Sequence, residues 1–149
     1  MESAALADLG RTALELSYPE EADEFDAAWD RHHGGGRHRP RPPVGIGVDL
    51  LPLADHLVTA LTFLSGAAAT RVTERATDAL TDRTKSRLAA LISRADIAPP
   101  RPAPLDAAQE REVFDLLVGR LRDVLSPEEA ERIAEGVIGA LRLRSGGER

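Results

Sequence analysis

Two segments of this chain are rich in glycine or proline and cannot continue a helix. The first, 34–43, reads Gly-Gly-Gly-Arg-His-Arg-Pro-Arg-Pro-Pro, and the second, 98–105, contains Pro-Pro-Arg-Pro-Ala-Pro. Glycine loosens the helical backbone, and proline lacks the amide donor that a helix needs. The two segments therefore predict linkers that divide the chain into blocks 1–33, 44–97 and 106–143, followed by a frayed tail, 144–149.

The first block contains two successive runs of apolar residues at helical spacing. These runs are Leu6, Leu9, Ala13 and Leu16, and then Tyr18, Ala22, Phe25 and Trp29. Ser17 lies between them, where its hydroxyl can cap a helix, and Pro19 suits the first helical turn that follows. Acidic residues fill the opposite side of the second run. The block therefore predicts a pair of short, acidic, amphipathic helices.

The middle block is the most apolar part of the chain. One stripe at helical spacing consists of Leu50, Ala54, Leu57, Leu61, Leu64, Ala68 and Val72. Asp49 can cap its start, and Pro52 fits the first turn. A single helix over 49–94 would be roughly 70 Å long at the helical rise, which exceeds a typical globular helix. We therefore expect a break near Thr81.

The C-terminal block carries two helix-start signals. Asp106 and Ser126 are each followed three residues later by a glutamine or a glutamate, which is the spacing of a capping box, and Pro127 takes the first helical position after Ser126. The apolar residues that follow at helical spacing are Phe114, Leu117, Leu121 and Val124, and then Ala130, Ala134, Val137 and Leu141. The block predicts a two-helix hairpin with a tight turn.

The composition indicates the same fold class. Hydrophobic residues make up 42% of the chain, which is enough for a packed core, but aromatic residues make up only 3%. Most of the apolar share is alanine and leucine, which favour helices, whereas sheets draw on valine, isoleucine, threonine and aromatic residues. We predict an all-α protein of five to six helices, with an apolar central helix flanked by an N-terminal helix pair and a C-terminal hairpin.

Cysteine content and charge limit the chemistry and the location. The chain has no cysteine, which excludes disulfides, thiolate nucleophiles and cysteine-bound metal centres. Glu2 and Asp8 stand where a secretory signal would carry basic residues, so a soluble, cytoplasmic protein is expected. The net charge is −6, and the acidic first block repels phosphate backbones. Nucleic acid is therefore not an expected partner.

The motifs of common catalytic and cofactor sites are missing. The sequence contains no Gly-x-Ser-x-Gly elbow and no Gly-x-x-x-x-Gly-Lys phosphate loop, and Lys85 is its only lysine. The Gly-Ile-Gly pattern at 45–47 lacks the third glycine and the preceding strand of a dinucleotide turn, and a flexible hinge is the better interpretation. We expect neither an enzymatic activity nor a bound cofactor.

Histidine and carboxylate spacing raises one metal hypothesis. Asp26, Asp30 and His33 lie at i, i+4 and i+7, so one helix face would present three ligands, with further histidines nearby. Acidic surface helices produce this spacing by chance, and a solvated helix leading into a polar loop is the favoured interpretation. His56, within the apolar middle block, fits a histidine at the edge of the core.

The central helix supplies the leading functional hypothesis. Its apolar residues occupy more than one side, and a small chain has few other helices to cover them. We therefore expect part of this surface to face a protein partner or another copy of the chain. The expected interaction residues are Leu50, Leu57, Leu61, Leu64 and Ala68. The protein is thus expected to be a non-enzymatic interaction or assembly module, such as an adaptor or a regulatory subunit.

A membrane-active effector is the alternative hypothesis. The run 57–69 contains only apolar and small residues, but it covers about 13 positions, where a membrane span needs roughly 20. The small residues at its end allow two helices to approach closely, as in membrane helix pairs. Under this alternative the central helix leaves the bundle and inserts into a bilayer.

Overall fold

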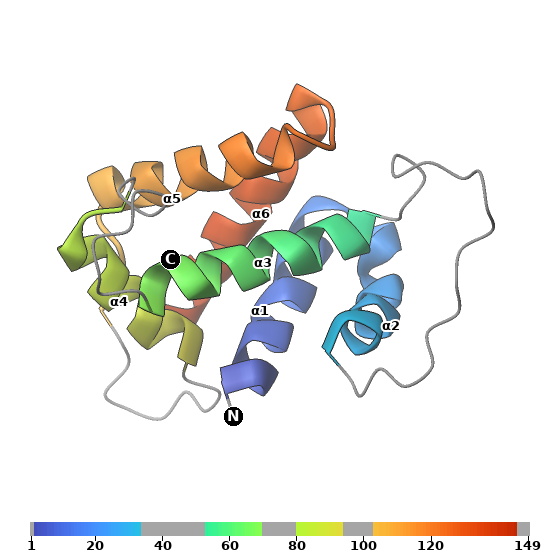
Figure 1. The fold of residues 1–149 in the computed structure, drawn as a ribbon, viewed down its shortest axis with the longest axis horizontal. Helices are drawn as coiled ribbons and strands as arrows, with labels where there is room; N and C mark the ends of the chain where they lie inside the picture. The colour runs from blue at the N-terminus through green and yellow to red at the C-terminus, as the bar shows by residue number, and fades with distance from the viewer. Residues whose placement is uncertain (1, 34–52, 70–79, 94–102, 146–149) are drawn as a thin grey trace.

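The computed structural model describes residues 2–33, 53–69, 80–93 and 103–145, and over these ranges the chain is all-α. The described residues form six α-helices and one short 3₁₀ turn, η1, with no strand among them (Figure 1). The elements are α1 (Glu2–Ser17), η1 (Pro19–Glu21), α2 (Ala22–His33), α3 (Leu53–Ala69), α4 (Asp82–Ser93), α5 (Ala107–Leu121) and α6 (Pro127–Ser145). The predicted fold class is confirmed.

The first block forms α1 and α2 as predicted, but Ser17 does not cap the second helix. Ser17 is the last residue of α1, and its buried hydroxyl donates to the carbonyl oxygen of Ala13 at 2.7 Å. Tyr18 takes the cap position of η1 without a side-chain hydrogen bond, and Pro19 follows it. The hydroxyl of Ser17 faces the protein interior, so a carbonyl one helical turn earlier accepts its hydrogen bond instead.

The described residues of the middle block form two helices, as expected. α3 ends at Ala69, α4 begins at Asp82, and α4 packs against α3 (Figure 1). The hydroxyl of Thr81 accepts a hydrogen bond from the amide of Thr84 at 3.2 Å and thereby caps the start of α4. The predicted break near Thr81 is confirmed. The predicted start signals at Asp49 and Pro52 lie outside the described residues.

The C-terminal block forms the predicted hairpin of α5 and α6. Asp106 caps α5 by accepting from the amide of Gln109 at 2.8 Å, and the Gln109 side chain accepts from the amide of Asp106 at 2.9 Å. Ser126 does the same for α6 by accepting from the amide of Glu129 at 3.2 Å. α6 continues to Ser145, past the expected end of the block at 143.

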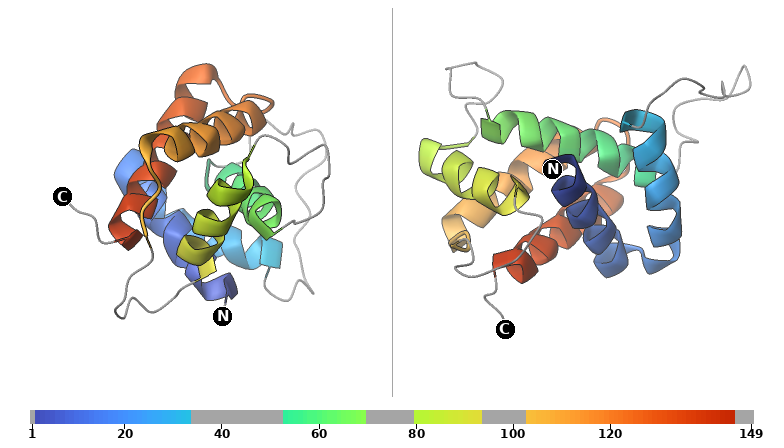
Figure 2. Two further views of the ribbon diagram at one scale, coloured as in Figure 1. Left: turned by 90° about the vertical axis from the view of Figure 1, so that its left-hand side faces the viewer. Right: turned by 90° about the horizontal axis from the view of Figure 1, so that it is seen from below.

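The helices α1 and α6 form the most extensive helix pair, and they pack antiparallel (Figure 2). Near the end of α6 the guanidinium of Arg144 donates to the carbonyl oxygen of Ala5 at 2.6 Å. Nearer its start the guanidinium of Arg132 lies 4.8 Å from the centre of the Tyr18 ring. Close approach depends on Gly136, because a Cβ there would lie 2.5 Å from the carbonyl oxygen of Ala13.

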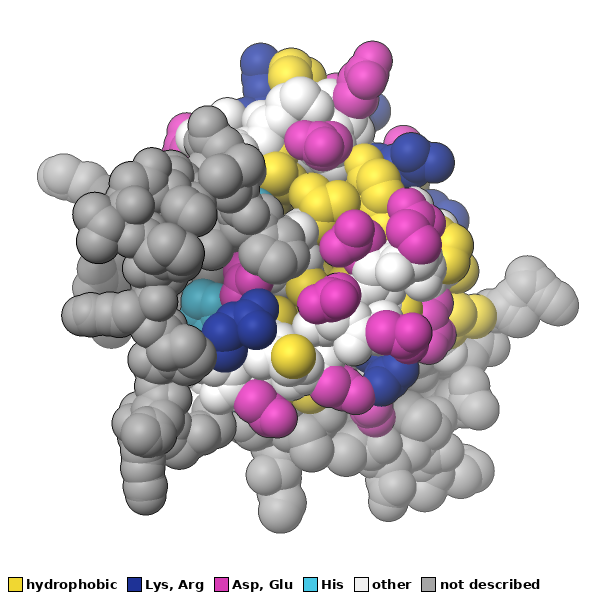
Figure 3. Space-filling model, turned by 90° about the vertical axis from the view of Figure 1, so that its right-hand side faces the viewer, with side chains coloured by type: hydrophobic (Ala, Val, Ile, Leu, Met, Phe, Trp, Pro, Cys, Tyr) yellow, Lys and Arg dark blue, Asp and Glu magenta, His cyan; other side chains and the backbone are white. Residues whose placement is uncertain are grey.

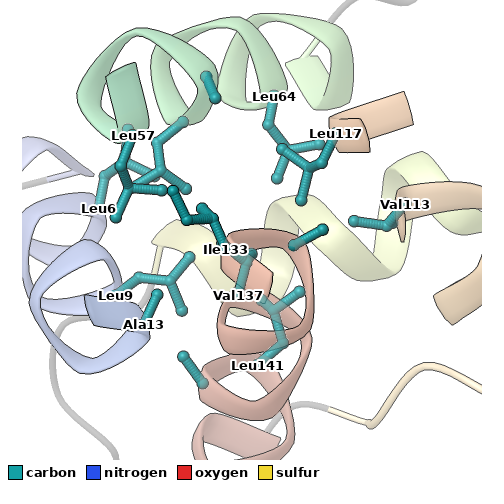
Figure 4. Packing of buried hydrophobic residues seen from close by; sticks show 14 of the residues in the cluster. Leu6, Leu9, Ala13, Leu57, Leu64, Val113, Leu117, Ile133, Val137 and Leu141 are labelled. Carbon is teal, nitrogen blue, oxygen red and sulfur yellow. The ribbon is translucent and has the colours of Figure 1, made fainter. Parts of the chain in front are cut away.

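The core lies where α1, α3 and α6 meet, and α5 closes it along one edge (Figure 4). Large apolar side chains from four helices converge there: Leu9 of α1, Leu57 of α3, Leu117 of α5 and Ile133 of α6. The α2 helix covers one end of α3, and α4 covers the other (Figure 1). All three sequence blocks therefore contribute to one core.

Candidate interaction surface

The apolar stripe of the central helix lies inside the bundle. Leu57, Leu61 and Leu64 have no exposed surface, and Ala68 is 8% exposed. Figure 4 shows Leu57 and Leu64 directed toward side chains of the neighbouring helices. Leu50, the fifth expected interaction residue, lies outside the described residues. A partner can therefore reach the four described positions only if the bundle opens, and binding through this stripe stays a prediction.

The stripe is covered because the first and third blocks both fold onto it. Leu6 and Leu9 of α1 approach it from one side, and Leu117 of α5 and Ile133 of α6 approach it from another. Each of these residues belongs to an apolar run of its own helix. These three amphipathic helices are enough to cover the stripe, although a count of helices in a small chain suggested that some of its surface would stay open.

The sides of α5 are hollowed where this helix meets its neighbours. The α5 helix packs mainly against α6 and to a lesser extent against α3, and it lies at the edge of the bundle (Figure 1). Three open hollows border it, with volumes of about 480, 420 and 340 Å³. A helix whose borders with its neighbours are hollowed presents the kind of relief that a partner helix or loop can fill.

The largest of these three hollows, here named the α5–α6 groove, lies between the two helices of the hairpin. Its lining consists of Ala107, Glu110, Arg111, Phe114, Glu135, Ile138 and Arg142. The guanidinium of Arg142 donates to both carboxylate oxygens of Glu110, at 2.7 and 2.9 Å, across the groove. The hydrogen bond to Glu110 and its negative charge raise the pKa of Arg142. This pair holds one end of the groove, and Phe114 and Ile138 supply apolar surface beyond it.

A second hollow lies between α5 and α3, beside Phe63. The guanidinium carbon of Arg120 stands 4.6 Å from the centre of the Phe63 ring, which is a cation–π contact. Glu112 lies in the same hollow, and its carboxylate accepts a hydrogen bond from the amide of Thr81 at 2.9 Å. These contacts fasten α5 to the end of α3 and to the start of α4. The third hollow lies at the other end of α5, where His56 is buried on α3 as expected.

Large apolar side chains are also exposed away from α5. Leu16 on α1 is 52% exposed and rests against Gly139 of α6, and Leu143 on α6 is 59% exposed. Figure 3 shows the face that carries α2, where hydrophobic side chains stand among more acidic than basic ones. Single exposed leucines are common on folded proteins, so these positions do not by themselves define a site.

A polar cluster lies between α2 and α3 and was not predicted from the sequence. Asp55 of α3 is 3% exposed, and both its oxygens accept from the guanidinium of Arg31, at 2.7 and 3.0 Å. The Nε2 atom of His32 lies 3.1 Å from the same carboxylate. The sequence feature that could have indicated this cluster is the carboxylate of Asp55 within a strongly apolar helix, because such a group needs a positive partner when it is buried. The cluster ties the end of α2 to α3.

Two of the three residues of the metal hypothesis, Asp26 and His33, are used in other contacts. Asp26 accepts a hydrogen bond from Arg11 of α1, which turns it toward a neighbouring helix. The ring of His33 stacks on Trp29 with 4.0 Å between ring centres, and its Nε2 atom lies 3.2 Å from the hydroxyl of Thr62. Among the described residues no three histidine or carboxylate side chains are grouped as metal ligands. The spacing along α2 therefore does not produce a ligand set within the described part of the chain.

Comparison of the chain with protein-family models, with curated proteins and with solved structures found no match. A search of the described helices for a membrane span found none that is both long enough and apolar enough. The candidate site therefore depends on the geometry of this chain alone. That geometry points to the α5 side of the bundle, which three hollows border.

Proposed function

We propose that this protein is a non-enzymatic helical interaction or assembly module that acts through the outer side of α5. The observation that carries the proposal is the run of three hollows along this helix, in which apolar floors are bordered by charged side chains. Protein interfaces combine an apolar centre with a polar rim in the same way. Phe63 and Phe114 supply the apolar centres, and the arginines of α5 supply part of the rim.

The interaction role fits the buried charge of this chain, because that charge joins two helices. Asp55 is the most buried carboxylate of the described residues, and Arg31 and His32 hold it between two helices. Its task in the fold is to join elements. The proposed partner is a protein, either a different one or another copy of this chain, and the absence of cysteine suits a cytoplasmic setting.

The membrane alternative requires α3 to leave the core. Three of its leucines are fully buried, and Asp55 is bound to Arg31 and His32 of α2. Opening the bundle would expose the apolar surface of the other helices and break this ion pair at the same time. These costs favour the interaction module as the leading proposal.

A pair of matched variants tests the proposal. The tagged full-length chain is used to isolate stoichiometric complexes from its native cells, in parallel with Phe114→Lys and Leu16→Lys. Both variants place a lysine on a partly or largely exposed apolar position, but only Phe114 borders a hollow of α5. We expect Phe114→Lys to lose the complex and Leu16→Lys to keep it; because Phe114 packs partly against the core, circular dichroism must show that each variant is folded at the assay temperature. Retention of the same complex by Phe114→Lys would place the interaction on another surface.

A further inference from the structure

We draw no further inference here: the strongest candidate, the α5–α6 groove between the two helices of the C-terminal hairpin, is an open hollow, and nothing in the structure shows what covers it.

Discussion

The guanidinium of Arg31 donates to both oxygens of Asp55, at 2.7 and 3.0 Å, and thereby joins the end of α2 to the start of α3. The carboxylate side chain is 4% exposed, while that of Arg31 is 41% exposed. The pair is therefore buried on the side of the acid and solvated on the side of the base. Loss of the arginine leaves a buried carboxylate with His32 as its remaining partner in the cluster.

The first prediction follows from this asymmetry. Arg31→Ala should lower the free energy of unfolding by about 1–2 kcal/mol, because it removes one partner of a largely buried carboxylate. Arg11→Ala is the matched control, since Arg11 pairs with the exposed Asp26, and it should cost only about 0.5 kcal/mol. Urea titration followed by circular dichroism measures both. An equal loss of unfolding free energy in the two variants would show that the burial of Asp55 does not strengthen its ion pair with Arg31.

The second prediction concerns two glycines in helices. Gly136→Ala should destabilise the protein by about 1–3 kcal/mol, because the new methyl group would lie 2.5 Å from the carbonyl oxygen of Ala13 and push α6 away from α1. Gly119→Ala on α5 should stabilise it by about 0.5–1 kcal/mol, since no atom lies within 4 Å and alanine is the better helix former. Thermal unfolding should separate the two variants by sign. A stabilising Gly136→Ala would mean that α1 and α6 are less closely packed than described.

The third prediction concerns the last turn of α6. The guanidinium of Arg144 donates to the carbonyl oxygens of Leu91 at 2.9 Å and of Ala5 at 2.6 Å, and so joins α6 to α4 and α1. Burial lowers the pKa of Arg144, and the negative charge of Asp8 opposes this shift. Arginine nevertheless stays protonated at ordinary pH. Arg144→Ala should therefore lower the free energy of unfolding by about 1–3 kcal/mol at any pH between 6 and 8.

Hydrogen exchange supplies the measurement for Arg144→Ala. The amides of the last turns of α4 and α6 should exchange faster in the variant, while those of α5 should keep their protection. Arg122→Ala, at an exposed position just after α5, is the control and should leave the exchange pattern unchanged. Unchanged exchange in Arg144→Ala would show that these two hydrogen bonds do not hold the helix ends together.

The fourth prediction separates the interaction module from the membrane effector. Leu57→Asp or Leu64→Asp should unfold the chain, because each places a charge at a fully buried position of the core. Circular dichroism should show loss of the helical signal in both variants. The wild-type protein should leave liposomes intact. Leakage of liposomes by the wild type, together with a folded Leu57→Asp variant that no longer causes it, would favour the membrane effector.

Local sequence signals determined the helices and most of their ends. The contacts involved span three or four residues, as in the Asp106–Gln109 capping box and the Thr81 cap of α4, so the chain near each position contains both partners. The stripes of apolar residues likewise follow from helical spacing within one segment. For this reason the all-α class, the break near Thr81 and the C-terminal hairpin were predictable from the amino-acid sequence.

Only the tertiary structure decided which surfaces are covered. Helical periodicity identifies Leu57, Leu61 and Leu64 as one face, but the same pattern suits a core face and a binding face, and it was the packing of α1, α5 and α6 that buried them. The Arg31–Asp55 pair and the close approach at Gly136 likewise join residues far apart in the chain. Such pairings depend on how whole helices cross, which no local spacing encodes. The α5–α6 groove arises in the same way, as the space that two helices leave between them.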